Sequence, residues 1–181
     1  MGPLRRITAT LAAAASLGLL PLAAAPAHAG PAANHAGMTW VIRQDGPGGT
    51  VHVGSDAQTH AYVGDTPATA SLPVLCVKVD GSPVPPGIVP DANAGWARGT
   101  VGATLPTPGT RLTSRLTADR LCEDVFYSGW RMAEFHDGRY GVDLGSVSGW
   151  SFWASENNAY KLPRGTRFWV AINDQLANPW N

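Results

Sequence analysis

Three residues that can carry acid–base chemistry lie within four positions of one another: Glu134, His136 and Asp137. A carboxylate and an imidazole can act as general acid and base, while a second carboxylate orients the imidazole. The same three residues also fit the solvated end of a strand, where His136 caps a turn. We favour this second interpretation, and a small secreted hydrolase that uses the three residues is the alternative.

The sequence lacks motifs with a firmer link to catalysis. The segment Gly145–Gly149 resembles the G-x-S-x-G turn of serine hydrolases, but Val147 occupies the position of the nucleophile. The histidines after residue 30 form neither the H-x-x-x-H nor the H-E-x-x-H spacing of a zinc site, and there is no Walker loop, dinucleotide fingerprint or EF-hand loop. From these motifs we expect neither a cofactor nor a metal ion.

Tryptophan is the residue type in excess, with seven in 181 residues. Its flat apolar ring can fill a core or, when it is exposed, present its face to an amphipathic ligand such as a sugar. We expect Trp130, Trp150 and Trp169 to lie in the core. Trp96, beside a proline-rich segment, and Trp180, close to the last residue, are expected to be exposed and are the candidate ligand-binding residues.

One short amphipathic helix is predicted over about 117–127. Thr117 suits the N-cap because its hydroxyl can accept a hydrogen bond from a backbone N–H of the first turn. Gly129 can adopt the left-handed conformation that ends a helix. The apolar run Trp130–Phe135 then predicts a strand, and His136–Gly138 predicts a turn. The apolar stripe of the helix consists of Leu121, Cys122, Val125 and Phe126.

The remaining sequence favours strands over helices, because many of its 21 glycines and 15 prolines interrupt it. Residues 72–79 are apolar on both alternating faces, which is typical of a central, buried strand, with Pro73 at its start. We therefore expect an α+β, loop-rich fold in which mostly short antiparallel strands pack around one principal helix, at about 117–127.

The segment 1–29 is typical of a secretory signal peptide. Two arginines are followed by an alanine- and leucine-rich apolar run, and positions 27–29 (A-H-A) form a cleavage signal. We predict cleavage after Ala29, a flexible segment over 30–37 and one globular domain over 38–181, so that the protein is secreted or periplasmic. An uncleaved membrane anchor is the alternative, and the proline within the apolar run weighs against it.

The two cysteines, Cys76 and Cys122, fall in the predicted central strand and in the predicted helix. An even number of cysteines in an exported protein usually indicates a disulfide. Neither residue lies in a C-x-x-C or metal-binding spacing. We therefore predict a disulfide that joins the strand to the helix, with two buried thiols as the alternative.

The charge balance argues against some partners. The full chain has 13 basic and 13 acidic residues, and removal of the segment 1–29, with its two arginines and no acid, leaves 11 basic and 13 acidic, a net charge of −2. Nucleic acids and anionic membrane surfaces attract basic patches, so we expect neither as a partner. After Ala29, no apolar run is long enough to span a bilayer.

Two resemblances extend these expectations. The segment Gly129–Gly138 (GWRMAEFHDG) resembles one in a group of small exported bacterial proteins. Similar short segments occur in that group at positions matching 64–66, 72–76 and 177–181. The helix and strand between Cys122 and Ala133 distantly resemble the first helix and strand of C-type-lectin-like domains, and residues 168–174 are similar to a core strand of those domains. The lectin resemblance implies Asn173 and Asp174 as calcium ligands.

Together these observations favour an exported, non-catalytic binding domain whose partner is a glycan or another component of the cell envelope. The small hydrolase stays the alternative. A cleft that gathers Glu134, His136 and Asp137 with Asp143 or Asp174 would favour the hydrolase. A row of exposed tryptophans would favour binding.

Export can be tested directly on the secreted protein. Mass spectrometry of the product recovered outside the cytoplasm should give Gly30 as its first residue, because the A-H-A signal ends at Ala29. A mature product that still carries the segment 1–29 would contradict the prediction.

Overall fold

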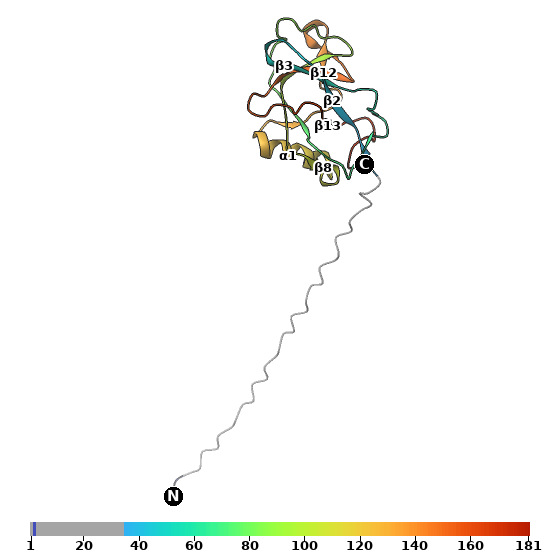
Figure 1. Ribbon diagram of the computed structural model, residues 1–181. Coiled ribbons are helices and arrows are strands. Elements are labelled where there is room, and N and C mark those ends of the chain that lie inside the picture. The colour runs from blue at the N-terminus through green and yellow to red at the C-terminus, as the bar shows by residue number, and fades with distance from the viewer. Residues whose placement is uncertain (1, 3–34) are drawn as a thin grey trace.

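The computed structural model describes Gly2 and residues 35–181 of the chain (Figure 1). Apart from Gly2, the predicted signal peptide lies outside these residues, as does most of the predicted flexible segment 30–37. At the boundary, β1 (Ala36–Gly37) pairs with β4 (Thr66–Pro67). The last two residues of the segment 30–37 are therefore paired with another part of the domain.

A nine-stranded sheet dominates the described part of the chain. Its main path runs in the order β11, β10, β7, β12, β3, β2 and β13, and β6 pairs with both β7 and β9. The pairs are antiparallel, except that β7 and β12 run parallel. The strands of this sheet are β2 (Thr39–Asp45), β3 (Thr50–Gly54), β6 (Leu75–Val79), β7 (Gly95–Ala103), β9 (Arg131–Met132), β10 (Arg139–Tyr140), β11 (Ser146–Val147), β12 (Ser151–Glu156) and β13 (Arg167–Trp169).

Short elements connect and cover this sheet. A two-stranded pair is formed by β5 (Ser71–Leu72) and β8 (Thr107–Pro108). The α-helix of the described residues is α1 (Arg115–Phe126). Residues 35–181 also contain three single turns of 3-10 helix, η1 (Pro47–Gly49), η2 (Gly109–Arg111) and η3 (Val142–Leu144).

The sheet closes on itself where β13 continues past Trp169. On one side, β13 pairs with β2. On the other side, Trp169 N donates to Pro73 O at 2.9 Å, just before β6, and Ala171 N donates to Ala133 O at 2.9 Å, just after β9. Since Phe135 N in turn donates to Ala171 O at 2.9 Å, the two ends of the sheet are joined by backbone hydrogen bonds.

Closure divides the apolar residues into an inner core and an outer cluster. In β6, Leu75 and Val77 belong to the inner core, whereas Cys76 and Val74, the residue before the strand, belong to the outer cluster. This division follows from the alternation of side chains across a strand. The largest residues of the inner core are Met38, Trp40, Phe135, Phe152 and Phe168. The outer cluster consists of Val74, Cys76, Leu112, Ala118, Cys122, Phe126, Trp130, Met132, Trp169 and Ala171.

Helix α1 begins two residues earlier than its sequence predicts. Ser114, and not Thr117, is the N-cap: its Oγ accepts a hydrogen bond from Thr117 N at 3.1 Å. The helix ends at Phe126, and Tyr127 already has a positive φ of 73°. Its buried residues, Ala118, Cys122 and Phe126, pack onto the outer cluster.

The predicted α+β fold built around a principal helix is wrong, because the sheet and not the helix forms the inner core. All the residues of the inner core lie outside α1, and the helix covers one patch of the sheet's outer face. In Figure 1, α1 lies at the margin of the domain, beside β8 and away from β3 and β12. The helical pattern is continuous in sequence and easily seen, whereas the pairings that close the sheet join residues far apart in the chain.

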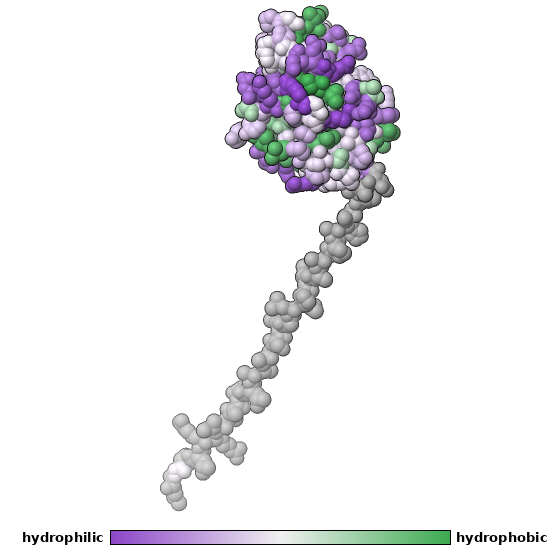
Figure 2. All heavy atoms as spheres, viewed as in Figure 1, coloured by the Kyte–Doolittle hydropathy of each residue, from purple (hydrophilic) through white to green (hydrophobic). Residues whose placement is uncertain are grey.

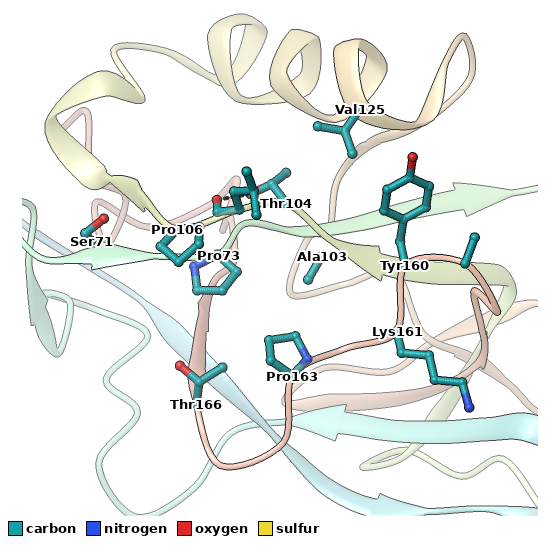
Figure 3. Close-up of a pocket in the computed structure, with 12 residues that line it drawn as sticks. Ser71, Pro73, Ala103, Thr104, Pro106, Val125, Tyr160, Lys161, Pro163 and Thr166 are labelled. Carbon is teal, nitrogen blue, oxygen red and sulfur yellow. Dashed lines mark hydrogen bonds between the residues drawn. The ribbon is translucent and has the colours of Figure 1, made fainter.

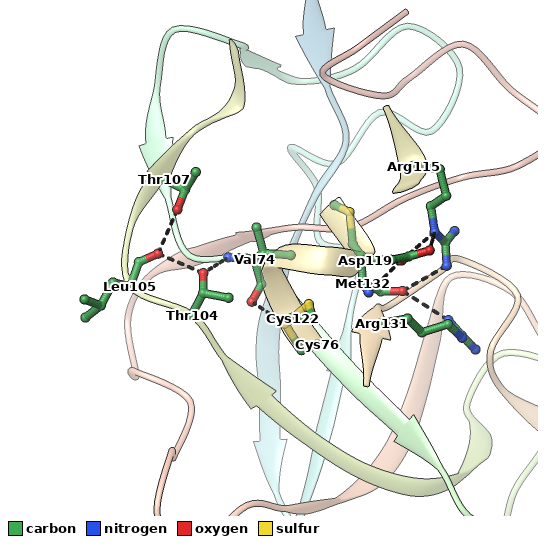
Figure 4. Close-up of a disulfide and its surroundings, with 10 residues drawn as sticks. All are labelled: Val74, Cys76, Thr104, Leu105, Thr107, Arg115, Asp119, Cys122, Arg131 and Met132. Atoms are coloured by element: carbon green, nitrogen blue, oxygen red, sulfur yellow. Dashed lines mark hydrogen bonds and ion pairs between the residues drawn. A yellow bond between two sulfur atoms is a disulfide. The ribbon is translucent and has the colours of Figure 1, made fainter. Parts of the chain in front are cut away.

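The predicted disulfide between Cys76 and Cys122 is confirmed (Figure 4). The two Cα atoms are 5.7 Å apart, within the usual range for a disulfide. Both cysteines are fully buried in the outer cluster. The bond therefore fixes the helix to β6, the strand that the sequence identifies as central.

The surface mixes polar and apolar residues. In the view of Figure 2, apolar residues form separate patches among polar ones. The most exposed large apolar side chains are Val142, Val89 and Leu105. Within residues 35–181, α1 and the other helical turns are too short or too polar to cross a membrane.

Removal of the disulfide should destabilise the domain strongly. Replacing Cys76 and Cys122 together by alanine should lower the free energy of unfolding by about 4 kcal/mol, the chain-entropy estimate for a separation of 46 residues. Denaturant unfolding followed by tryptophan fluorescence measures the change. The parent protein unfolded under reducing conditions is the control and should match the variant. An unchanged midpoint in both would contradict a stabilising role.

Candidate binding site

Glu134 ties two segments of the chain together instead of facing solvent. Its side chain is 6% exposed. One carboxylate oxygen accepts a hydrogen bond from His136 N at 2.7 Å, and the other accepts one from Asn173 N at 3.0 Å. The second oxygen also lies 3.1 Å from His136 Nδ1. Glu134 therefore holds the turn at His136 against the segment that follows β13.

Asp137 also has a structural role, as a buried acceptor of hydrogen bonds. Its carboxylate accepts hydrogen bonds from both terminal nitrogens of Arg131 and, at 2.7 Å, from Glu134 N. Burial of the Arg131 guanidinium opposes its charge, but the bonds to Asp137 outweigh this and raise the pKa of Arg131. Neither carboxylate of the predicted acid–base group is open to bind a substrate.

His136 is the accessible member of this group, with its side chain 35% exposed. Its Nε2 lies 3.9 Å from Asp174 Oδ2. The structure therefore gathers the three predicted acid–base residues beside Asp174, as the hydrolase interpretation requires. However, no serine, threonine or cysteine side chain within residues 35–181 hydrogen-bonds to His136. The arrangement can orient the ring of His136 as a hydrogen-bonding group.

The lectin resemblance implied a calcium site at Asn173 and Asp174. The Asn173 side chain instead accepts a hydrogen bond from Arg115 Nη1 at 3.2 Å. Within the described residues, no three His, Cys, Asp or Glu side chains are grouped as metal ligands. The geometry of this part of the chain therefore offers no argument for a bound cation.

The exposure of three tryptophans differs from the prediction. Trp96 is fully buried, and its Nε1 donates to Ser82 O at 2.8 Å. Trp180 is half-buried and packs against the outer cluster. Trp150, which was expected in the core, is 40% exposed. Strand alternation could not separate the first and last of these cases, because glycines adjoin both Trp96 and Trp150 in the sequence.

Trp150 forms the wall of a small hollow. The edge of its ring packs against Phe135, with ring centres 5.0 Å apart and planes at 71°. Its backbone has a positive φ of 71°, which is costly for a residue with a large side chain and is found at functional sites. A side chain at Gly149 would meet the Phe135 ring at 2.5 Å, so this turn requires glycine before Trp150.

The hollow combines aromatic faces with polar groups. Its volume is about 140 Å³, and Tyr62, on its rim, is 57% exposed. Asp174 and Gln175 supply the polar side chains. His136 is close to both the aromatic and the polar lining. Its ring centre is 4.8 Å from that of Phe135, with the two rings edge to face, and its Nε2 lies beside Asp174. The full lining is Ala61, Tyr62, Phe135, Trp150, Ile172, Asp174 and Gln175.

A larger groove, of about 700 Å³, lies between β7, α1 and the segment after β12 (Figure 3). Three prolines and several small apolar residues form most of its lining. The rings of Tyr160 and Phe126 pack edge to face, with their centres 5.1 Å apart. Lys161 lies next to Tyr160 on the same wall of the groove. The hydroxyl of Thr104 is occupied by Val74 N and Leu105 O. The groove is therefore suited to an apolar group.

A serine–histidine pair, which the sequence analysis did not identify, lies on neighbouring strands. His52 Nε2 is 2.8 Å from Ser151 Oγ, and the Ser151 hydroxyl donates to Asn93 O. Since that proton is already donated, His52 Nε2 must be the donor to Ser151 and cannot act as its base. Ser151 is also 1% exposed. The pair is therefore structural.

The pKa of His52 is lowered to about 4, chiefly by burial and in addition by the charge of Arg43. The imidazole stacks on Trp153, with ring centres 4.6 Å apart and planes at 13°. It is therefore neutral at physiological pH, in agreement with its role as a donor to Ser151.

Comparisons of the chain with protein-family models, with curated proteins and with solved structures found no match. The arguments about function therefore rest on the geometry of the hollow and of the groove.

The free energy of unfolding should decrease when the pH is lowered from 6.5 to about 4, because His52 has a lower pKa in the folded chain than in the unfolded chain. In this pH range His52 is protonated in the unfolded chain but stays neutral in the folded chain. Lowering the pH therefore favours the unfolded chain. The full shift corresponds to about 3 kcal/mol, and we expect roughly half because the ring is partly exposed. Denaturant unfolding at several pH values measures the loss.

His52→Gln is the matched control, because its amide can still donate to Ser151 but does not titrate. Above pH 6.5 its stability should vary with pH as in the parent protein. Its decline between pH 6.5 and 4 should be shallower. Parallel curves for the two proteins over this range would contradict the assignment to His52.

Proposed function

We propose that the chain is an exported, non-catalytic binding domain that takes a glycan in the hollow beside Trp150. The observation that carries this proposal is an exposed tryptophan ring in a fixed orientation, with polar side chains within the same hollow. Sugar rings have an apolar face and a polar rim, so they match a site of this composition. The buried disulfide supports export, because such bonds persist in oxidising compartments.

Each group has a distinct part in this proposal. The sugar ring stacks on Trp150, whose position is set by Phe135 and by its own positive φ directly after Gly149. Asp174 accepts hydrogen bonds from sugar hydroxyls, and His136, oriented by Glu134, donates or accepts another. Because Trp150 and His136 are held before the ligand arrives, little conformational entropy is lost on binding.

A second candidate is binding of an acyl chain of an envelope lipid in the groove beside Tyr160. The groove has the volume and the mainly apolar lining that are usual for small-molecule sites. Lys161, on the same wall, can pair with an anionic head group. The two candidates concern separate surfaces and predict different residues as essential.

Trp150→Ala should weaken glycan binding by at least about tenfold, because an exposed aromatic anchor contributes a large share of the affinity at such sites. The probes are an array of bacterial glycans and soluble peptidoglycan fragments, followed by titration calorimetry with the tightest one. The fold should be retained, since the ring lies at the surface.

Tyr160→Ala is the matched control, since it removes an exposed aromatic ring from the groove. It should leave glycan affinity within about twofold of the parent. If Tyr160→Ala abolishes binding of a fatty acid and no glycan binds to the parent protein, then the second candidate is correct. If the parent protein instead cleaves these glycans and His136→Ala stops cleavage without unfolding, the hydrolase alternative is correct.

A further inference from the structure

Three arginines meet at a second hollow, on another part of the surface. This hollow has a volume of about 140 Å³. Arg98 comes from β7, Arg131 from β9 and Arg139 from β10. The remaining lining residues are Val79, Ala97 and Asp137. Among the lining residues, one carboxylate faces three guanidinium groups, an excess of two positive charges. The charges of Asp119 and Glu134 also act on Arg131, so the uncompensated charge is that of Arg98 and Arg139.

The backbone at Arg98 is shaped to hold this residue at the hollow. Arg98 has a positive φ of 58°, and its carbonyl oxygen accepts hydrogen bonds from both Asp80 N and Gly81 N at 3.0 Å. A Cβ at Gly99 would lie 1.9 Å from Lys78 O, so the strands approach closely only with glycine there. The strained conformation is stabilised by these two hydrogen bonds, and the exposed side chain of Arg98 lines the hollow.

Arg131 and Arg139 are fixed in place by other contacts. Arg131 is held by Asp137 on both terminal nitrogens and by Met132 O. One terminal nitrogen of Arg139 donates to His136 O and Gly138 O, which are backbone acceptors that do not neutralise its charge. Within residues 35–181, no carboxylate forms an ion pair with Arg98 or Arg139. Both guanidinium groups thus retain donors for a ligand.

We propose that this arginine hollow binds a tetrahedral oxyanion, phosphate or sulfate, either as the free ion or as the terminal monoester of a larger molecule. Guanidinium groups present planar pairs of N–H donors that match the oxygens of such anions. Four oxygens can be shared among several arginines, whereas a carboxylate has only two. None of the residues that line the Trp150 hollow or the groove lines this site, so the inference does not rest on the proposed glycan or lipid ligand.

The test is titration calorimetry of the purified chain with inorganic phosphate, sulfate and methyl phosphate, at an ionic strength held constant with chloride. We expect saturable binding with a dissociation constant of about 1 mM or below. Arg98→Gln should weaken phosphate binding about tenfold, because the variant lacks one guanidinium group with its charge and its paired N–H donors. Methyl phosphate that binds as well as phosphate identifies a monoester as the ligand, and much weaker binding of methyl phosphate identifies the free ion.

Arg43→Gln is the control, since Arg43 is exposed, lies on β2 and lines none of the hollows described above. It removes the same charge and should change the affinity less than about twofold. Absence of saturation up to about 50 mM phosphate would overturn the proposal. Equal weakening by the two substitutions would also overturn it, because it would reveal a general effect of net charge. Circular dichroism should show that both variants are folded.

Discussion

The closure of the sheet between β13 and the strands β6 and β9 is the constraint on which the rest of the structure depends. Trp169 N, Ala171 N and Phe135 N donate the backbone hydrogen bonds that join the two ends. Without them the inner core would have an open side, because Phe168 and Val170 close it. The same pairing brings residues 133–136 alongside residues 171–174, and thus sets the surface that carries His136 and Asp174.

Closure of the sheet also explains why Glu134 and Asp137 have structural roles. A short turn pressed against another segment exposes backbone N–H groups that need acceptors once they are buried. Glu134 accepts from His136 N and Asn173 N, and Asp137 accepts from Glu134 N. A buried N–H left without a partner costs about 1–3 kcal/mol, so carboxylates at these positions have a strong structural reason to be there. The sequence E-F-H-D resembles an acid–base site because both uses require the same residue types.

What could be predicted from the sequence were features with a local or chemical signature. The helix at 115–126, the strand around Cys76 and the disulfide follow from periodicity and from cysteine number. The closed sheet could not be predicted, since the parallel pairing of β7 with β12 joins residues 55–57 positions apart and leaves no local pattern. Trp150 was misassigned for the same reason: its exposure is decided by a glycine turn and by Phe135, which is distant in the sequence.

The segment 131–139 presents different chemistry to its two sides. On one side, Glu134 orients His136 toward Asp174, beside the Trp150 hollow. On the other, Asp137 fixes Arg131 in the arginine hollow. The chain turns between these residues, with Asp137 N donating to Glu134 O at 3.0 Å, so one short segment can contribute to both surfaces. The carboxylates do not themselves bind ligand at either surface but fix a cationic or titratable neighbour in position, and such fixed side chains bind with a smaller entropic penalty. Within this segment His136 is the member left open to solvent, so a ligand in the Trp150 hollow would meet its imidazole and the neighbouring Asp174, and not the buried carboxylates of Glu134 and Asp137.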